Sequence, residues 1–168
     1  MQTAADKEIF LQLIEGNKGI IYKICNAYCS DKADRDDLVQ EIIYQLWKSG
    51  HSFDAGQRFT TWMYRVALNV AISFYRKGNK ENTITSLSGE EENIADNTSN
   101  TNELEENIER LQHFINELKE LDRALMILYL ESKTYKEIAE ILGITETNVA
   151  SKISRIKEKL KQKFNKIN

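Results

Sequence analysis

The chain has 168 residues, a net charge of −3 and 41% hydrophobic residues, which allows one helical domain or two small ones. It contains no apolar run long enough to cross a membrane and no signal-peptide pattern, so we expect a cytoplasmic protein. No glycine-rich phosphate loop is evident, and no nucleophile stands near a base. We therefore expect no catalytic residues, no cofactor and no small-molecule substrate.

Apolar residues at helical spacing predict four helices in the first half of the chain. Their approximate ranges are Lys7–Glu15, Lys18–Cys29, Ala33–Ser49 and Thr60–Arg76. Asp31 stands where it can cap the third helix. Cys25 and Cys29 are four residues apart, and since no second pair of ligands is evident, we interpret them as packing residues and predict no metal.

The third and fourth of these helices differ in character. In the third, Leu38, Ile42 and Leu46 predict a buried face. The fourth mixes aromatic rings with cations, which suits the π-faces of unstacked bases. The aromatic residues could instead be core, which we expect for Trp62 and Phe74. Tyr64 and Tyr75 stand beside cations, and we expect them to be partly exposed.

An acidic segment follows these helices. Residues 79–109 hold nine acidic side chains and one basic, with many Asn, Ser and Thr and few aliphatic residues. Such a composition buries little core and is typical of a linker. We therefore predict a first domain at residues 1–78, an acidic linker at 79–106 and a second domain at 107–168.

The second domain contains the pattern of a helix-turn-helix. Thr134 and Glu137 form the sequence of a capping box, Gly143 ends that helix, and Thr145 can cap the next one. Val149, Ile153, Ile156 and Leu160 make one apolar stripe on the second helix. The opposite side carries polar and basic groups suited to base edges and phosphates. The pattern also fits two amphipathic helices of an ordinary bundle.

Two stretches together resemble a known family. Residues 36–41 (DDLVQE), Leu46-Trp47 and residues 59–69 (FTTWMYRVALN) are similar to region 2 of bacterial RNA polymerase sigma factors. Residues 121–160, with YKEIAEILGI at 135–144, resemble region 4. Having only these two regions is the layout of the extracytoplasmic-function group. The resemblance implies an all-α fold of two small helical domains joined by a flexible linker.

The resemblance also implies partners and roles. The third helix would bind the β′ clamp helices of core polymerase through Asp37, Leu38, Gln40, Glu41 and Trp47. The fourth would recognise and melt the −10 element of promoter DNA through Phe59, Tyr64, Arg65, Asn69, Tyr75, Arg76 and Lys77. The second helix of the helix-turn-helix would read the −35 element through Thr145, Thr147, Asn148, Ser151, Lys152, Arg155 and Lys159. Further implied partners are the polymerase β flap and an anti-sigma factor, which in this family can be membrane-bound.

Two other functions remain open from the residues themselves. A stand-alone helix-turn-helix regulator would need a dimer interface or an effector module, and neither is evident. An enzyme acting on nucleic acid would need clustered acids, for which Asp34, Asp36 and Asp37 are the candidates. These acids are better explained as the favourable start of a helix.

Overall fold

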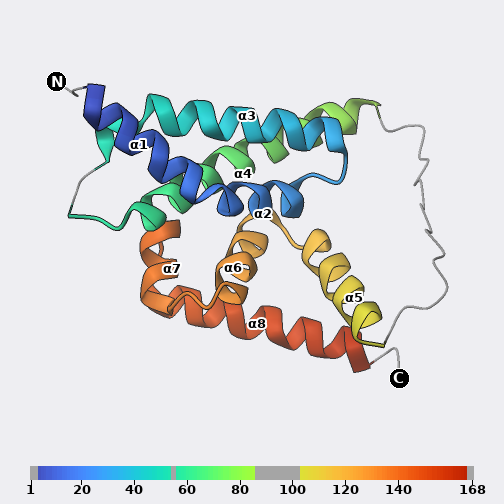
Figure 1. Ribbon diagram of the computed structural model, residues 1–168. Coiled ribbons are helices and arrows are strands. Elements are labelled where there is room, and N and C mark those ends of the chain that lie inside the picture. Colours follow the sequence, from blue (N-terminus) through green and yellow to red (C-terminus); the bar gives the residue numbers. More distant parts are fainter. Residues whose placement is uncertain (1–3, 54–55, 86–102, 166–168) are drawn as a thin grey trace.

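A computed structural model of the chain describes residues 4–53, 56–85 and 103–165. Every regular element in these ranges is helical, and the helices form two tiers (Figure 1). The first unit contains α1 (Ala4–Gly16), α2 (Lys18–Tyr28), α3 (Lys32–Lys48), the short 3₁₀ helix η1 (Gly50–Ser52) and α4 (Phe59–Thr85). The second unit contains α5 (Glu103–Glu117), α6 (Glu120–Leu130), α7 (Tyr135–Leu142) and α8 (Glu146–Asn165).

The first unit is built around α4, which packs against both α2 and α3. The predicted stripe of α3 is confirmed, because Leu38, Ile42 and Leu46 are all fully buried. Met63 and Leu68 of α4 are buried in the same core. Asp31 occupies the N-cap position of α3, but its side chain makes no capping hydrogen bond. Its contribution is therefore limited to negative charge near the positive end of the helix.

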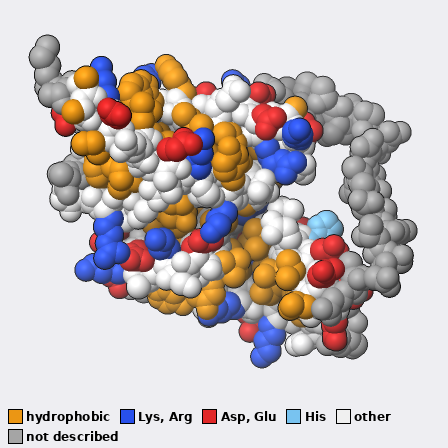
Figure 2. Space-filling view, viewed as in Figure 1, with side chains coloured by type: hydrophobic (Ala, Val, Ile, Leu, Met, Phe, Trp, Pro, Cys, Tyr) orange, Lys and Arg blue, Asp and Glu red, His pale blue; other side chains and the backbone are white. Residues whose placement is uncertain are grey.

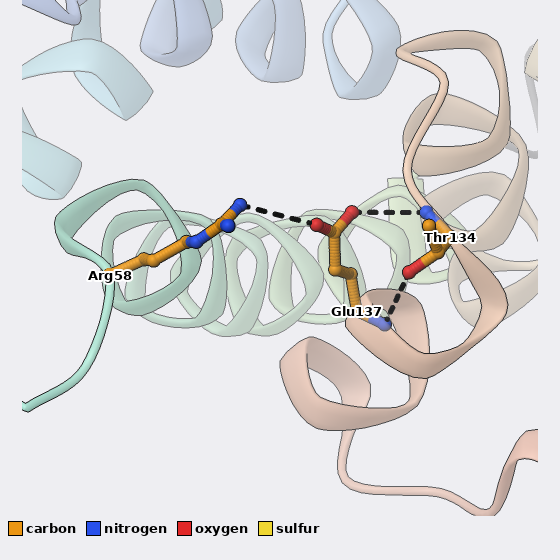
Figure 3. Close-up of polar contacts among 3 residues, drawn as sticks. All are labelled: Arg58, Thr134 and Glu137. Carbon is orange, nitrogen blue, oxygen red and sulfur yellow. Dashed lines mark hydrogen bonds and ion pairs between the residues drawn. The ribbon is translucent and has the colours of Figure 1, made fainter.

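The predicted capping box at the start of α7 is confirmed in both directions (Figure 3). The Thr134 Oγ1 accepts from the Glu137 backbone N–H at 3.1 Å, and a Glu137 carboxylate oxygen accepts from the Thr134 N–H at 3.0 Å. Gly143 ends the helix at a φ of 69°, the left-handed conformation that glycine adopts without a Cβ clash. The Thr145 hydroxyl accepts from the Asn148 N–H at 3.1 Å and so caps α8.

The end of the fourth helix differs from the prediction. The helix continues to Thr85, nine residues beyond the expected end at Arg76, and α5 already begins at Glu103. Both helices thus extend into the range 79–106 that we expected to be linker, and residues 86–102 lie outside the described residues. The physical reason is that the residues just after Arg76 are polar and charged but include no proline, and a single glycine there, Gly78, is tolerated inside a helix.

The two units share one hydrophobic core. A single cluster of buried side chains runs from Phe10 in α1 to Ile156 in α8. Across the boundary, α4 contacts α6 and α7, while α2 contacts α5 and α6 (Figure 1). The sequence predicted two units on a tether, and it did not predict that their surfaces meet. This set of contacts is called the closed interface below.

The two cysteines lie inside the first unit. Both thiols are free and buried, as expected for packing residues. Burial raises the pKa of the Cys25 thiol to about 12 and that of the Cys29 thiol to about 11, so both are neutral near pH 7. Among the described residues, no group of three or more His, Cys, Asp or Glu side chains is placed to hold a metal ion. None of the described helices is long and apolar enough to span a bilayer.

Candidate nucleic-acid interface

The last helix, α8, presents its polar face to solvent. Val149, Ile153 and Ile156 are buried on the opposite side, so the predicted apolar stripe is confirmed. The residues predicted to read duplex DNA lie away from that core, and most of them are exposed: Thr145, Thr147, Ser151, Arg155 and Lys159, with Asn148 and Lys152 half-buried. Small polar groups and cations on one open helical face have the arrangement needed to enter a major groove.

The third helix, α3, exposes four of its five predicted polymerase-binding residues. Asp37, Gln40 and Glu41 are exposed, and Trp47 is 44% exposed. Leu38 is different, because it is fully buried in the core of the first unit. Its predicted contact with a partner is therefore corrected: its side chain holds α3 in place and is not available at the surface.

A groove of about 1150 Å³ lies between α3 and α4. Asp37, Gln40 and Glu41 line one side of it, and Asn69 and Lys77 line the other. The fold therefore places a predicted polymerase-binding surface directly beside two of the predicted −10 residues. Its lining mixes carboxylates, amides and one ammonium with the apolar side chains of Val70 and Phe74, so it can accept a ligand with both polar and apolar parts.

Aromatic side chains gather at the start of α4. The Phe59 ring packs edge-on against Phe53, with the ring centroids 5.4 Å apart, and against Phe10 at 5.9 Å. Trp62 lies in the same cluster and is 4% exposed, so its expected core role is confirmed. Phe59 itself is only partly buried. Edge-to-face pairs of this kind stabilise a core beyond the area that they bury.

The two tyrosines of α4 have different environments. Tyr75 is partly exposed, as predicted, whereas the prediction for Tyr64 is wrong, since that residue is only 3% exposed. The ammonium of Lys133, from the turn between α6 and α7, lies 5.4 Å from the Tyr64 ring centroid. Burial, followed by the nearby Glu131 carboxylate, raises the pKa of Tyr64 to about 12. The second unit therefore contributes to the surroundings of a predicted DNA contact.

Basic side chains of the first unit meet acceptors of the second along the closed interface. Glu137 pairs with Arg58 at 3.5 Å through the carboxylate oxygen that does not take part in the capping box (Figure 3). The other contacts are Lys23 with Glu131 at 2.8 Å, Arg76 with Glu120 at 3.5 Å, and Arg65 with the Glu140 backbone oxygen. Figure 2 shows acidic and basic side chains together near the boundary of the tiers.

These surface pairs are individually weak. The Arg58 and Arg76 side chains remain 80% and 64% exposed. Exposed ion pairs contribute ~0–1 kcal/mol each, because water and salt screen them and because two long side chains must be ordered. Their importance lies in which groups they occupy, since Arg65 and Arg76 are both predicted −10 contacts.

The most deeply buried charged side chain at the closed interface belongs to Arg123, which the sequence patterns did not single out. Arg123 of α6 is 3% exposed, and its guanidinium donates to the Ala27 oxygen of α2 at 3.0 Å and to the Leu118 oxygen at 3.1 Å. It also lies 5.2 Å from the Tyr28 ring centroid and 4.7 Å from that of Tyr75. The sequence pattern that could have identified this residue is an arginine inside an apolar run, LDRALMILYL.

Tyr28 completes this contact. Its hydroxyl donates to the Glu120 oxygen of α6 at 2.7 Å, and its ring packs edge-on against Tyr75 with the centroids 6.1 Å apart. Burial raises the pKa of Tyr28 well above its ordinary value, so the hydroxyl stays protonated and keeps donating. Helices α2, α4 and α6 are thus joined through one arginine and two tyrosines.

Comparison with known protein families matches both halves of the chain. Residues 13–81 match the model of Sigma-70 region 2, and residues 108–160 match the model of Sigma-70, region 4. These ranges include α2, α3 and most of α4, and then most of α5–α8, in the order that the resemblance implied. Together they cover well over half of the chain.

Curated relatives and solved structures agree with this match. The chain is 30% identical to the ECF RNA polymerase sigma factor SigM of Bacillus subtilis over 149 residues, covering 87% of this chain and 89% of that protein. It is 26% identical to SigW of the same organism, covering 95% and 90%. The structure of RpoE with the anti-sigma factor NepR, from Bartonella quintana, superposes with a TM-score of 0.68 at 21% identity, covering 92% of this chain and 96% of that one. CnrH in complex with the cytosolic domain of CnrY gives 0.67 at 19% identity, covering 95% and 89%.

Proposed function

The chain belongs to the extracytoplasmic-function group of the sigma-70 family of RNA polymerase sigma factors, and from this premise we propose how its two units divide the work of transcription initiation. A sigma factor binds core polymerase and directs it to specific promoters, so it acts as a transcription regulator rather than as an enzyme. The observation that supports the proposal is that α4 and α8, which lie in separate units, both present polar and basic side chains to solvent.

The second unit reads the −35 element as duplex. The exposed face of α8 enters the major groove, where Thr147, Asn148 and Ser151 approach base edges. Arg155 and Lys159 hold base edges and phosphates at the same face, and Thr145 and Lys152 flank it. The position after Val149 is occupied by Ala150, so the reading of bases rests on these other side chains.

The first unit opens and reads the −10 element. Asn69 and Lys77 stand in the groove beside α3, where an unstacked base and its phosphate have room. Phe59, Tyr64 and Tyr75 supply aromatic faces, while Arg65 and Arg76 supply cations for the backbone of a single strand. Unstacking a base costs a few kcal/mol, which contacts to the flipped base offset.

Core polymerase is held at two places. The exposed residues Asp37, Gln40, Glu41 and Trp47 of α3 bind the β′ clamp helices. A second contact uses an apolar groove of about 510 Å³ between α5 and α8, which we assign to the β flap. Ile108, Leu111, Leu160 and Phe164 line this groove, and lysine stems flank it. An apolar groove between two helices suits an amphipathic helix of the partner.

An anti-sigma factor is the proposed inhibitor. One solved structure with the same fold is of the sigma factor RpoE in complex with the anti-sigma factor NepR, and another is of CnrH in complex with the cytosolic domain of CnrY. Because the partner in the second complex is a cytosolic domain, a membrane-anchored inhibitor should be tested as well as a free one. The functional need is general, because a sigma factor that is always active would compete for polymerase.

Run-off transcription with core polymerase tests the function. We expect the chain to bind core polymerase and to start transcripts at a defined set of promoters, mapped on genomic DNA of the source. Asn69→Ala is expected to lower promoter opening by a factor of ten or more while polymerase binding is kept. Asn26→Ala, an exposed asparagine on α2, is the matched control.

Two results would contradict the proposal. The first is a chain that fails to bind core polymerase and leaves the start sites unchanged. The second is a chain that protects promoter duplex without polymerase, which would favour the stand-alone regulator. If the Asn69→Ala variant opens promoters normally, only the −10 role assigned to that residue is contradicted.

A further inference from the structure

Helix α5 is buried at its C-terminal end and exposed toward its N-terminal end. Its buried residues, Phe114 and Ile115, both lie in the last turn of the helix. Toward the other end, Ile108 is 56% exposed and Leu104 is 64% exposed. An apolar stripe at helical spacing therefore runs along α5 from the core into solvent.

The exposed part of this stripe forms one wall of the apolar groove between α5 and α8. Ile108 and Leu111 line the groove from α5, and Leu160 and Phe164 line it from α8. A partner helix fills such a groove only when its two walls stand at a suitable separation, because the axes of packed helices lie about 8–10 Å apart. The contact proposed for this groove therefore depends on the angle between α5 and α8.

The length of α5 makes this angle sensitive to its buried end. The helix has 15 residues, which gives it a length of about 22 Å at about 1.5 Å per residue. A rotation of about 10° about the buried end would displace the exposed end by about 4 Å, close to half the separation of two packed helices. A contact that fixes the buried end of α5 therefore controls the width of the groove.

Arg123 of α6 makes such a contact. The last carbonyl groups of a helix have no partner within the helix. The Nη2 group of Arg123 donates to the Asn116 oxygen, in the last turn of α5, and to the Leu118 oxygen just beyond it at 3.1 Å. The positive charge also lies at the negative end of the helix dipole. Arg123 is 3% exposed, so water competes little for these two carbonyls.

We propose that Arg123 is a positioning residue for the polymerase contact: by capping the C-terminal end of α5, it fixes the angle between α5 and α8 and so holds the groove at the width that takes a helix of core polymerase. This inference rests on the proposed function and identifies the residue that shapes its second polymerase contact. The Asn116 and Leu118 oxygens belong to the same unit as Arg123, so these two bonds do not depend on contacts between the units.

An arginine suits this role better than a lysine does. The planar guanidinium presents its N–H groups in a fixed fork, whereas an ammonium is a point charge without this geometry. One terminal nitrogen of Arg123 reaches both carbonyls of the α5 end, and the other donates to the Ala27 oxygen of α2 at 3.0 Å. Arg123→Lys keeps the charge and should lose the fork, so this variant separates charge from positioning.

A second contact ties the same end of α5 to α8. Lys163 of α8 pairs with the Glu117 carboxylate, and its ammonium lies 5.4 Å from the Phe114 ring centroid. The side chains of the pair are 50% and 54% exposed, and exposed pairs are weak because water screens them. Arg123 and Lys163 therefore hold the end of α5 from two directions, with Arg123 as the main contact.

Distances between spin labels on α5 and α8 of the full chain test the positioning. The labels are attached at Glu105→Cys and Gln162→Cys, which replace exposed residues. Cys25 and Cys29 are buried and their thiol pKa values are raised, so the introduced thiols react first. We expect a narrow distance distribution in the labelled parent and one about 4 Å wider in Arg123→Lys, the displacement of a rotation of about 10°. Helix content by circular dichroism should be unchanged.

Tyr28→Phe is the matched control. It removes the hydroxyl that donates to the Glu120 oxygen of α6 at 2.7 Å, which is a contact between the two units. It leaves the bonds from Arg123 to the end of α5, so its distribution should stay narrow. An unchanged distribution in Arg123→Lys, or equal broadening in both variants, would overturn the proposal, because the cap would then not set the angle.

A charge reversal provides a second route if Arg123→Lys loses helix content. Glu117→Lys places two ammonium groups together at the end of α5 and should broaden the distribution, though less than Arg123→Lys. The double variant Glu117→Lys/Lys163→Glu should restore the pair and the narrow distribution. No broadening in the single variant, or no restoration in the double, would show that the buried end of α5 does not set its angle and would overturn the proposal.

Binding to core polymerase tests whether Arg123 acts through the groove. Ile108→Asp places a carboxylate in the groove and should weaken binding about tenfold, and Arg123→Lys should weaken it about fivefold. Adding Arg123→Lys to Ile108→Asp should then change the affinity by less than about twofold, because both variants remove the same contact. Additive losses would overturn the proposal. If the wild-type chain does not bind core polymerase, the proposed function fails, and the label distances alone decide whether Arg123 positions α5.

Discussion

The helices α4 and α8 are both proposed to read promoter DNA, yet they differ in the side chains that they present and in how far these are buried. α8 presents small polar and basic side chains to solvent on one face. α4 carries aromatic rings that are buried or half-buried, with α6 and α7 packed against the helix, and cations that remain exposed. The difference follows from what each helix must bind. Base edges in a duplex are polar, whereas unstacked bases offer flat π-faces.

The aromatic rings of α4 that are proposed to stack on bases are apolar. They can therefore pack against the second unit when DNA is absent. Cations of the second unit, Lys133 and Arg123, lie over the rings of Tyr64 and Tyr75. The arginines beside these rings also meet the second unit, since Arg76 pairs with the Glu120 carboxylate and Arg65 donates to the Glu140 backbone oxygen. The polar face of α8 has little apolar area to bury and remains in water. The comparison shows that aromatic rings of α4 are removed from water by packing, whereas the polar face of α8 stays in water.

The largest expected effect tests whether the two units share one core. Ile153 of α8 is fully buried, so Ile153→Ala should lower the free energy of unfolding by ~2–5 kcal/mol, through lost apolar contacts and a cavity. Differential scanning calorimetry should show one transition that moves to lower temperature. Ser154→Ala, exposed on the same helix, is the control and should change stability by less than about 0.5 kcal/mol. A separate transition of the first unit at an unchanged temperature would contradict a shared core.

The next-largest expected effect distinguishes the proposed roles of α8 and α4. Arg155→Ala removes an exposed cation of α8 and should weaken binding of holoenzyme to promoter duplex by about 1–3 kcal/mol. The radius of gyration of the free chain should not change, because this residue lies on the open face. Arg65→Ala should spare duplex binding and instead lower promoter opening. Competition binding and permanganate footprinting measure the two steps, and equal effects of both variants on both steps would remove the distinction.

A smaller effect concerns the capping box that orders α7 against α4. Thr134→Ala removes the acceptor of the Glu137 N–H and should cost ~1 kcal/mol in urea unfolding. It should also loosen Glu137, whose other carboxylate oxygen pairs with Arg58. Thr147→Ala is a suitable control, since that threonine is exposed in the first turn of α8. Equal stability of the two variants would show that the box does not order α7.

The smallest effect is a pH dependence of closure. Burial raises the pKa of Tyr64 from about 10 to about 12. A group with a raised pKa at the closed interface stabilises that interface fully below about pH 10 and loses this contribution as pH rises toward about 12. Small-angle X-ray scattering across this range should show expansion, and Tyr64→Phe should shift its midpoint upward. Identical midpoints would mean that the expansion comes from other groups, such as the lysine side chains.

Local signals in the sequence were sufficient for the turn motif and for the buried faces. Thr134, Glu137 and Gly143 act through hydrogen bonds and backbone angles within a few residues, so their roles follow from spacing alone. The end of α4 was harder to predict, because the charged residues after Arg76 indicated a linker although nothing there stops a helix. The candidate site residues on α8 are exposed or half-buried, whereas Leu38 on α3 and Tyr64 on α4 are buried, and the roles of the exposed residues stay predictions.

The sequence by itself determined the helical fold, the family and the two helices proposed to read DNA, because these depend on periodic patterns and short motifs. Only the tertiary structure decided that the two units close on each other, that Tyr64 is buried and that Leu38 is unavailable at the surface. The physical reason is separation along the chain. Arg123 bonds to Ala27 across 96 residues, and such a pair leaves no periodic trace for a sequence to reveal.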